Sequence, residues 1–166
     1  ERIHHLNSVL KAIRNVNQLI TQEDDPDELA RRSCELLVET RGYNAAWIGL
    51  EKANGDSLQV HGSGIEPEAM KEMLSGIDRG DIPSCWSRCR ETRGAVITTD
   101  PEQECPECSM ATCFADSGSV TLRLRHGKEA YGYLSVSVPS QYVRDPEEIA
   151  LFEEVAGDIA FALHDI

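Results

Sequence analysis

Five of the six cysteines lie close together between positions 85 and 113, at Cys85, Cys89, Cys105, Cys108 and Cys113. The first two have the spacing CxxxC, which suits one turn of a helix, and the next two form a CxxC. Thiol groups at such spacings bind one zinc ion or oxidise to a disulfide. The spacing therefore predicts a metal or redox site in this part of the chain.

The charges around these cysteines differ between the two groups. Acidic residues without any intervening Lys or Arg surround the second group: Asp100, Glu102, Glu104, Glu107 and Asp116. This acidity favours a bound cation and disfavours a reactive thiolate. Arg88, Arg90 and Arg93 lie beside the first pair and favour its thiolate forms. Three interpretations stay open, which are a zinc site, a redox disulfide and inert, partly buried thiols.

Composition excludes several classes of partner. Sixteen basic and 29 acidic residues give a net charge of −13, which repels nucleic acid and anionic lipid. No apolar run approaches the roughly 20 residues of a membrane span, and no basic segment followed by an apolar core begins the chain. We therefore expect a cytoplasmic protein without nucleic-acid or membrane contacts.

The sequence predicts a long helix over residues 3–20 as the first element of the fold that positions the cysteines. Its apolar residues follow the alternating spacing of a heptad seam, at Ile3, Leu6, Leu10, Ile13 and Ile20. Asn17 fills the missing place, where a buried amide fixes the register of parallel dimers. The pattern predicts a coiled-coil-like signalling helix over 1–22 that forms a homodimer. The alternative is an amphipathic helix packed on its own domain, because Val9 and Val16 widen the stripe.

Helices and strands are mixed in the rest of the chain, which predicts an α+β fold. A second helix carries Cys34 on its apolar face and ends at Gly42, and the final helix spans 146–166. A shorter helix is predicted at 67–74 and strands at 44–52, 57–61, 95–99, 120–125 and 131–138. Asn54 and Gly55 suit a tight turn between the first two strands. Residues 76–113 otherwise lack periodicity and predict a long functional loop.

The last strand and the last helix carry the clearest patterns. Leu134, Val136 and Val138 alternate with Tyr133, Ser135 and Ser137, so one face of this strand is apolar and the other more polar. Asp145 and Glu148 resemble a capping box that begins the final helix. Its apolar residues again step by three and four, so we expect this helix to continue into an output domain.

The order of these elements, and the segment YGYLSVSVPSQYVRDPEEIALFEEVAGDIAFALHDI, resemble the GAF family. The opening segment IHHLNSVLKAIRNVNQLITQEDDPDELARRSCELLVETRGYNAAWIGL is similar to GAF domains that follow PAS domains in bacterial sensor histidine kinases. The resemblance implies a GAF domain over 23–166. It also implies a central antiparallel sheet with terminal helices on one face and a loop-covered small-molecule pocket on the other. Candidate pocket residues are Trp47, His61, Arg123, Tyr133 and Ser135.

The departures from the family narrow the expected function. No NKFDE-type motif and no Cys-His pair occur, so neither a cyclic nucleotide nor a bilin is the expected ligand. We expect a non-catalytic sensory domain that binds a small molecule, zinc or a redox signal and regulates an output kinase through dimeric helices. The GAF-type free methionine-R-sulfoxide reductases are one alternative, with Cys85 or Cys105 as nucleophile. A purely structural dimerisation module is another.

Overall fold

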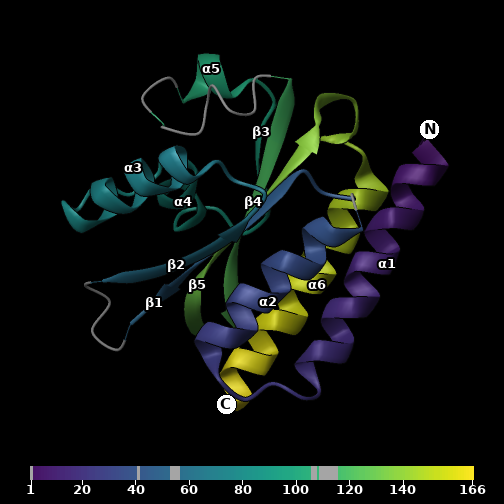
Figure 1. The fold of residues 1–166 in the computed structure, drawn as a ribbon, viewed down its shortest axis with the longest axis horizontal. Helices are drawn as coiled ribbons and strands as arrows, with labels where there is room; N and C mark the ends of the chain where they lie inside the picture. The colour runs from purple at the N-terminus through teal and green to yellow at the C-terminus, as the bar shows by residue number, and fades with distance from the viewer. Residues whose placement is uncertain (1, 41, 53–56, 106–107, 109–115) are drawn as a thin grey trace.

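The computed structural model describes residues 2–40, 42–52, 57–105, 108 and 116–166. A five-stranded antiparallel sheet has the order β2-β1-β5-β4-β3. The strands are β1 (Ala45–Glu51), β2 (Leu58–Ser63), β3 (Val96–Thr98), β4 (Ser117–His126) and β5 (Glu129–Pro139). Long helices α1 (Arg2–Ile20), α2 (Pro26–Glu39) and α6 (Pro146–Asp165) cover one face. Helices α3 (Pro67–Asp78), α4 (Ser84–Cys89) and α5 (Pro101–Glu104) lie on the other, so the predicted α+β fold is confirmed (Figure 1).

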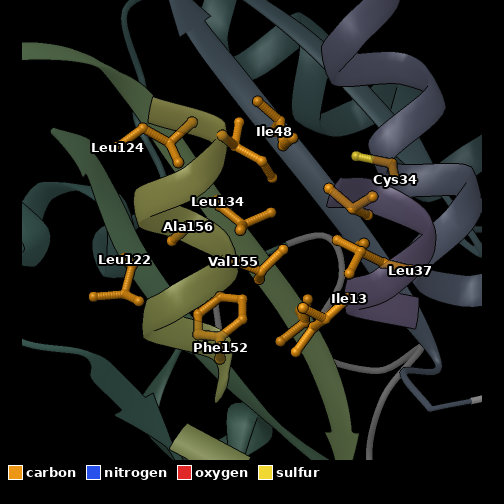
Figure 2. Packing of buried hydrophobic residues seen from close by; sticks show 14 of the residues in the cluster. Ile13, Cys34, Leu37, Ile48, Leu122, Leu124, Leu134, Phe152, Val155 and Ala156 are labelled. Carbon is orange, nitrogen blue, oxygen red and sulfur yellow. The ribbon is translucent and has the colours of Figure 1, made fainter. Parts of the chain in front are cut away.

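The main core lies between the sheet and the three long helices. Leu134, Val136 and Val138 face these helices, as their alternation predicts. Figure 2 shows Leu122 and Leu134 of the sheet beside Phe152 and Val155 of α6. Cys34 is fully buried in the same cluster, so its predicted core position is confirmed.

Acidic residues cap two of these helices. Asp25 accepts a hydrogen bond from the backbone of Glu28 at 2.9 Å, and Asp145 accepts one from the backbone of Glu147 at 3.0 Å. The second half of the predicted capping box is wrong. The Glu148 carboxylate bonds to His5 of α1 at 2.6 Å, and the Asp145 N–H that a capping box would offer it donates to the Tyr142 carbonyl instead.

Helix α1 packs on its own domain through a stripe that only partly coincides with the predicted seam. Val9, Ala12 and Val16 are fully buried in the main core, while Ile3 is 71% and Leu10 39% exposed. The predicted seam is therefore divided: Ile13 is buried in the core and Ile20 packs against it, while Ile3 and Leu10 face outward and are here called the outward stripe. Helix α1 lies before the predicted boundary at residue 22, and it packs in the same main core as the elements after that boundary.

The segment predicted as a long loop contains regular structure. Strand β3 confirms the strand predicted at 95–99, whereas helices α4 and α5, with six and four residues, are too short to produce a periodic sequence pattern. The predicted turn at Asn54 and Gly55, and Cys113, lie outside the described residues. Within the described ranges, no helix is long and apolar enough to cross a membrane.

Candidate functional site

The face of the sheet beneath α3, α4 and α5, here called the inner face, carries polar and aromatic side chains. Trp86 of α4 is fully buried on it and stacks on Tyr133 of β5, with ring centroids 5.0 Å apart. Its Nε1 donates to Ser135 Oγ at 2.9 Å, and Ser135 in turn pairs with Thr121 Oγ1 at 2.7 Å. The indole therefore fills the middle of the inner face with its polar atom satisfied.

A glycine in β1 makes room for this ring. A Cβ at Gly49 would lie 2.6 Å from two carbons of the Trp86 indole, closer than non-bonded carbons approach. The Trp86 indole therefore packs closely on Gly49 of β1 as well as on Tyr133 of β5. Trp86 was not among the predicted site residues, and its only sequence signal was a large aromatic residue inside CWSRC.

A charged pair lies at the edge of the aromatic stack. Arg123 Nη2 is 2.6 Å from Glu51 Oε1, and the two side chains are 13% and 16% exposed. The Arg123 guanidinium also lies over the Tyr133 ring, 4.3 Å from its centroid. Arg90 Nε donates to the Tyr133 hydroxyl at 2.5 Å. Tyr133 is therefore held between an indole and two guanidinium groups.

The structure brings together four of the five predicted pocket residues. Trp47, Tyr133 and Ser135 lie on the inner face with Arg123. His61 does not join them, because its Nε2 is 3.0 Å from Asp27 Oδ1 at the start of α2. The side chains of β2 alternate, and Val60 takes the inward position instead.

Three of the predicted cysteines lie around one small cavity. Cys85, Cys105 and Cys108 line a space of about 40 Å³ together with Ser137. The Ser137 hydroxyl is buried and has no hydrogen-bond partner among the described residues. Cys89 is buried in the inner-face cluster but does not line this space.

Burial makes two of these thiols weak acids. It raises the pKa of Cys85 to about 12, although a hydrogen bond with Thr121 acts in the opposite direction. Burial also raises the pKa of Cys89 to about 11, and the charges of Arg123, Arg125 and Arg88 only partly offset it. Since the thiolate is the reactive form, neither group is activated as a nucleophile in this arrangement.

The described cysteines do not by themselves complete a set of metal ligands. Over the ranges that the structure covers, no group of three or more His, Cys, Asp or Glu side chains is placed to hold a metal ion. Cys113 lies outside those ranges, so the zinc hypothesis stays a prediction.

A wider, open groove lies beside the small cavity. It measures about 590 Å³ and runs along α3, where Glu72, Lys71 and Arg79 line it. Pro83 and Cys108 border both spaces, so the groove meets the thiol-lined cavity at these two residues. Nothing in the sequence distinguished this groove, because its polar residues look like any exposed helix surface.

Solved structures with this fold come from several kinds of protein. The GAF domain of an Acinetobacter phosphoenolpyruvate-protein phosphotransferase has a TM-score of 0.64 at 8% identity, covering 94% of this chain and 92% of that one. The nlh2 GAF domain of A. Aeolicus in an inactive state has a TM-score of 0.66 at 8% identity, covering 98% and 97%. Free methionine-R-sulfoxide reductase from Neisseria meningitidis, in complex with its substrate, has a TM-score of 0.60 at 13% identity, covering 92% and 86%.

At these identities the likeness shows the fold alone. No curated protein sequence matches the chain. The family model for the GAF domain, however, matches residues 23–164, which is most of the sequence. The chain therefore belongs to the GAF family.

Proposed function

We propose that this GAF domain is a regulatory sensory domain without catalytic activity of its own. It receives a small-molecule, metal or redox signal on the inner face and transmits it through α1 and α6 to an output domain. The observation that carries the proposal is that β5 serves both faces. Tyr133 and Ser135 contact Trp86, while Leu134 and Val136 lie in the helical core, so a shift of this strand reaches both.

The first and last helices are joined where they begin. Figure 1 shows α1 and α6 side by side. Arg2 Nε is 2.5 Å from Asp145 Oδ2, and the buried His5 Nε2 is 2.6 Å from Glu148 Oε1. A displacement of α6 on the sheet is therefore passed directly to α1.

We propose that the outward stripe of α1 forms a parallel homodimer. Ile3 and Leu10 are exposed, and Leu10 lines an open groove of about 500 Å³ between α1 and α6 together with Asn17 and Leu151. A second copy of α1 would cover these apolar side chains and bring two Asn17 amides together. In the homodimer, the α1 helices of the two copies pair, and the signal is transmitted as a change in their packing.

The dimer is tested by substitutions on the outward stripe. Deleting residues 1–20 would remove buried Val9 and Val16, so loss of the dimer would not be separable from unfolding. The variant Ile3→Glu with Leu10→Glu changes only exposed positions, and Lys11→Gln is an exposed control on the same helix. Sedimentation should find a dimer for the wild type and control and a monomer for the double variant. A wild-type monomer, or a dimer that survives both substitutions, rejects the interface.

We propose a histidine kinase as the output domain, in a cytoplasmic protein. The support is the similarity of the opening segment to GAF domains that follow PAS domains in such kinases. Autophosphorylation of the longer protein with ATP, compared between wild type and the Ile3→Glu, Leu10→Glu variant, tests the link between the helices and the output.

A second candidate function is reduction of free methionine-R-sulfoxide. The cavity lined by Cys85, Cys105 and Cys108 favours it, and the Neisseria meningitidis enzyme has the same fold. The raised pKa of Cys85 counts against it. Turnover of methionine-R-sulfoxide with a thiol reductant, lost in Cys85→Ser, would replace the sensory proposal with this enzyme.

The nature of the cysteine site needs a separate measurement. Elemental analysis of protein purified without chelator, together with a thiol count, separates the metal, redox and small-molecule alternatives. About one zinc per chain indicates a structural metal site. Metal-free protein whose thiols disappear reversibly under mild oxidant indicates a redox sensor, and metal-free thiols that stay unchanged assign the signal to a small molecule.

A further inference from the structure

Four arginine side chains gather around the end of α4 and the middle of β4, namely Arg88, Arg90, Arg123 and Arg125, here called the arginine cluster. Arg90 donates to the Tyr133 hydroxyl at 2.5 Å, and Arg125 Nη2 donates to the Cys89 carbonyl at 3.2 Å. Arg88 Nη2 is 3.4 Å from Thr98 Oγ1. The charges of Arg123, Arg125 and Arg88 each partly offset the rise that burial causes in the pKa of Cys89, so all three lie within electrostatic range of this thiol.

This concentration of positive charge stands out in a chain whose net charge is −13. Among the described residues, only Arg123 of the cluster forms an ion pair, which is with Glu51 at 2.6 Å. The charge of Arg88 also lowers the pKa of Glu104, but the Glu104 carboxylate accepts hydrogen bonds from the Thr99 hydroxyl and the Asp100 backbone N–H. Four guanidinium groups with so few carboxylates repel one another and attract an anion.

One donor of the cluster is unused. Arg123 Nη1 is buried and has no hydrogen-bond partner among the described residues. Buried polar groups are nearly always paired, so an unpaired guanidinium N–H indicates a missing acceptor such as a water or an ion. The Arg90 guanidinium lies over the same Tyr133 ring, 5.9 Å from its centroid, and is exposed to solvent. Tyr133 therefore has a buried, unused Arg123 donor on one side and an Arg90 side chain that reaches the surface on another.

We propose that the arginine cluster binds the carboxylate or phosphate group of a small organic ligand. This inference rests on the proposed sensory function and names the chemical class of its ligand. Exposed Arg90 and Arg125 attract the anionic group, and Arg123 supplies its unused N–H from the inner face. Because Tyr133 lies between these guanidinium groups and Trp86, the bound anion is separated from the indole by the Tyr133 ring. Binding at the cluster thus reaches the strand that serves both faces of the sheet.

The test titrates the purified protein with sodium phosphate and, separately, with sodium succinate. Sodium chloride at matched ionic strength is the reference, because non-specific attraction is screened equally by all three salts. Calorimetry and Trp fluorescence measure binding. The variants are Arg90→Gln and Arg125→Gln, both at exposed positions, and Arg144→Gln is the control, an arginine just before α6 and outside the cluster.

Saturable binding that each cluster variant weakens about tenfold, and that Arg144→Gln leaves within about twofold, supports the site. Binding of phosphate alone assigns a phosphorylated ligand, and binding of succinate alone assigns a carboxylate ligand. The proposal is overturned if neither anion gives a saturable response beyond chloride, or if Arg144→Gln weakens binding as much as the cluster variants. Sedimentation of the dimer stays independent of this result, so a failed anion site leaves the relay proposal standing.

Discussion

The packing of Trp86 against Gly49 gives the sharpest stability prediction. The fully buried indole loses its contacts in Trp86→Ala, which we expect to cost about 3–5 kcal/mol. The lost N–H bond adds little, because Ser135 keeps Thr121 as a partner at 2.7 Å. Gly49→Ala alone places a methyl group 2.6 Å from the ring, and overpacking of this kind costs about 1–3 kcal/mol.

In the Trp86→Ala background, Gly49→Ala should stabilise the protein instead of destabilising it. With the indole gone, the methyl group that Gly49→Ala adds would lie in the vacated space, and replacing a strand glycine by alanine then stabilises by about 0.5–1 kcal/mol. The double-mutant cycle should therefore show a coupling free energy of about 2–4 kcal/mol. Urea unfolding followed by circular dichroism measures it.

Gly94→Ala is a matched control, because it makes the same glycine-to-alanine change at a position that does not contact Trp86. A Cβ at Gly94 would meet no atom within 4 Å. Gly94→Ala should therefore be additive with Trp86→Ala to within about 0.5 kcal/mol. If Gly49→Ala is also additive with Trp86→Ala, the indole does not lie on β1 and the description of the inner face is wrong.

Three further predictions concern other contacts. Burial raises the pKa of Glu148 from 4.5 to about 7, so the folded state holds its proton and loses stability as pH rises through that range. Urea unfolding at about pH 5 and about pH 8 should show that Glu148→Gln removes this loss. Burial lowers the pKa of His5, so His5 decreases the stability of the folded state only as pH falls through 6.5. Gly157→Ala in α6, where a Cβ meets no atom within 4 Å, should raise stability by about 0.5–1 kcal/mol in thermal unfolding. Arg123→Gln should cost about 3 kcal/mol in urea unfolding by leaving Glu51 unpaired, and adding Glu51→Gln should recover part of it.

Much of the fold follows from local patterns. In β5 the alternation of Leu134, Val136 and Val138 with polar residues determined which face meets the helices, because side chains of a strand alternate strictly. Asp145 marked the start of the final helix, since a carboxylate before a helix satisfies its first N–H groups.

The site was less accessible to sequence analysis because it depends on pairing between distant strands. Glu51 and Arg123 meet only because β5 lies between β1 and β4, and nothing in their local sequence marks them as partners. The place of Trp86 likewise depends on Gly49, and the six residues of α4 are too few to show a helical period. His61 was a candidate pocket residue, but the alternation of β2 directs its side chain to Asp27 of α2.

Hydrogen exchange in Trp86→Phe tests the central claim most directly. This variant keeps an aromatic ring on Tyr133 but removes the N–H that bonds Ser135 at 2.9 Å. If the inner face communicates with the terminal helices through β5, amides of α1 should exchange faster than in the wild type, and by more than those of α2. Faster exchange confined to α3, α4 and α5, or equal acceleration of α1 and α2 as global unfolding would give, contradicts the relay.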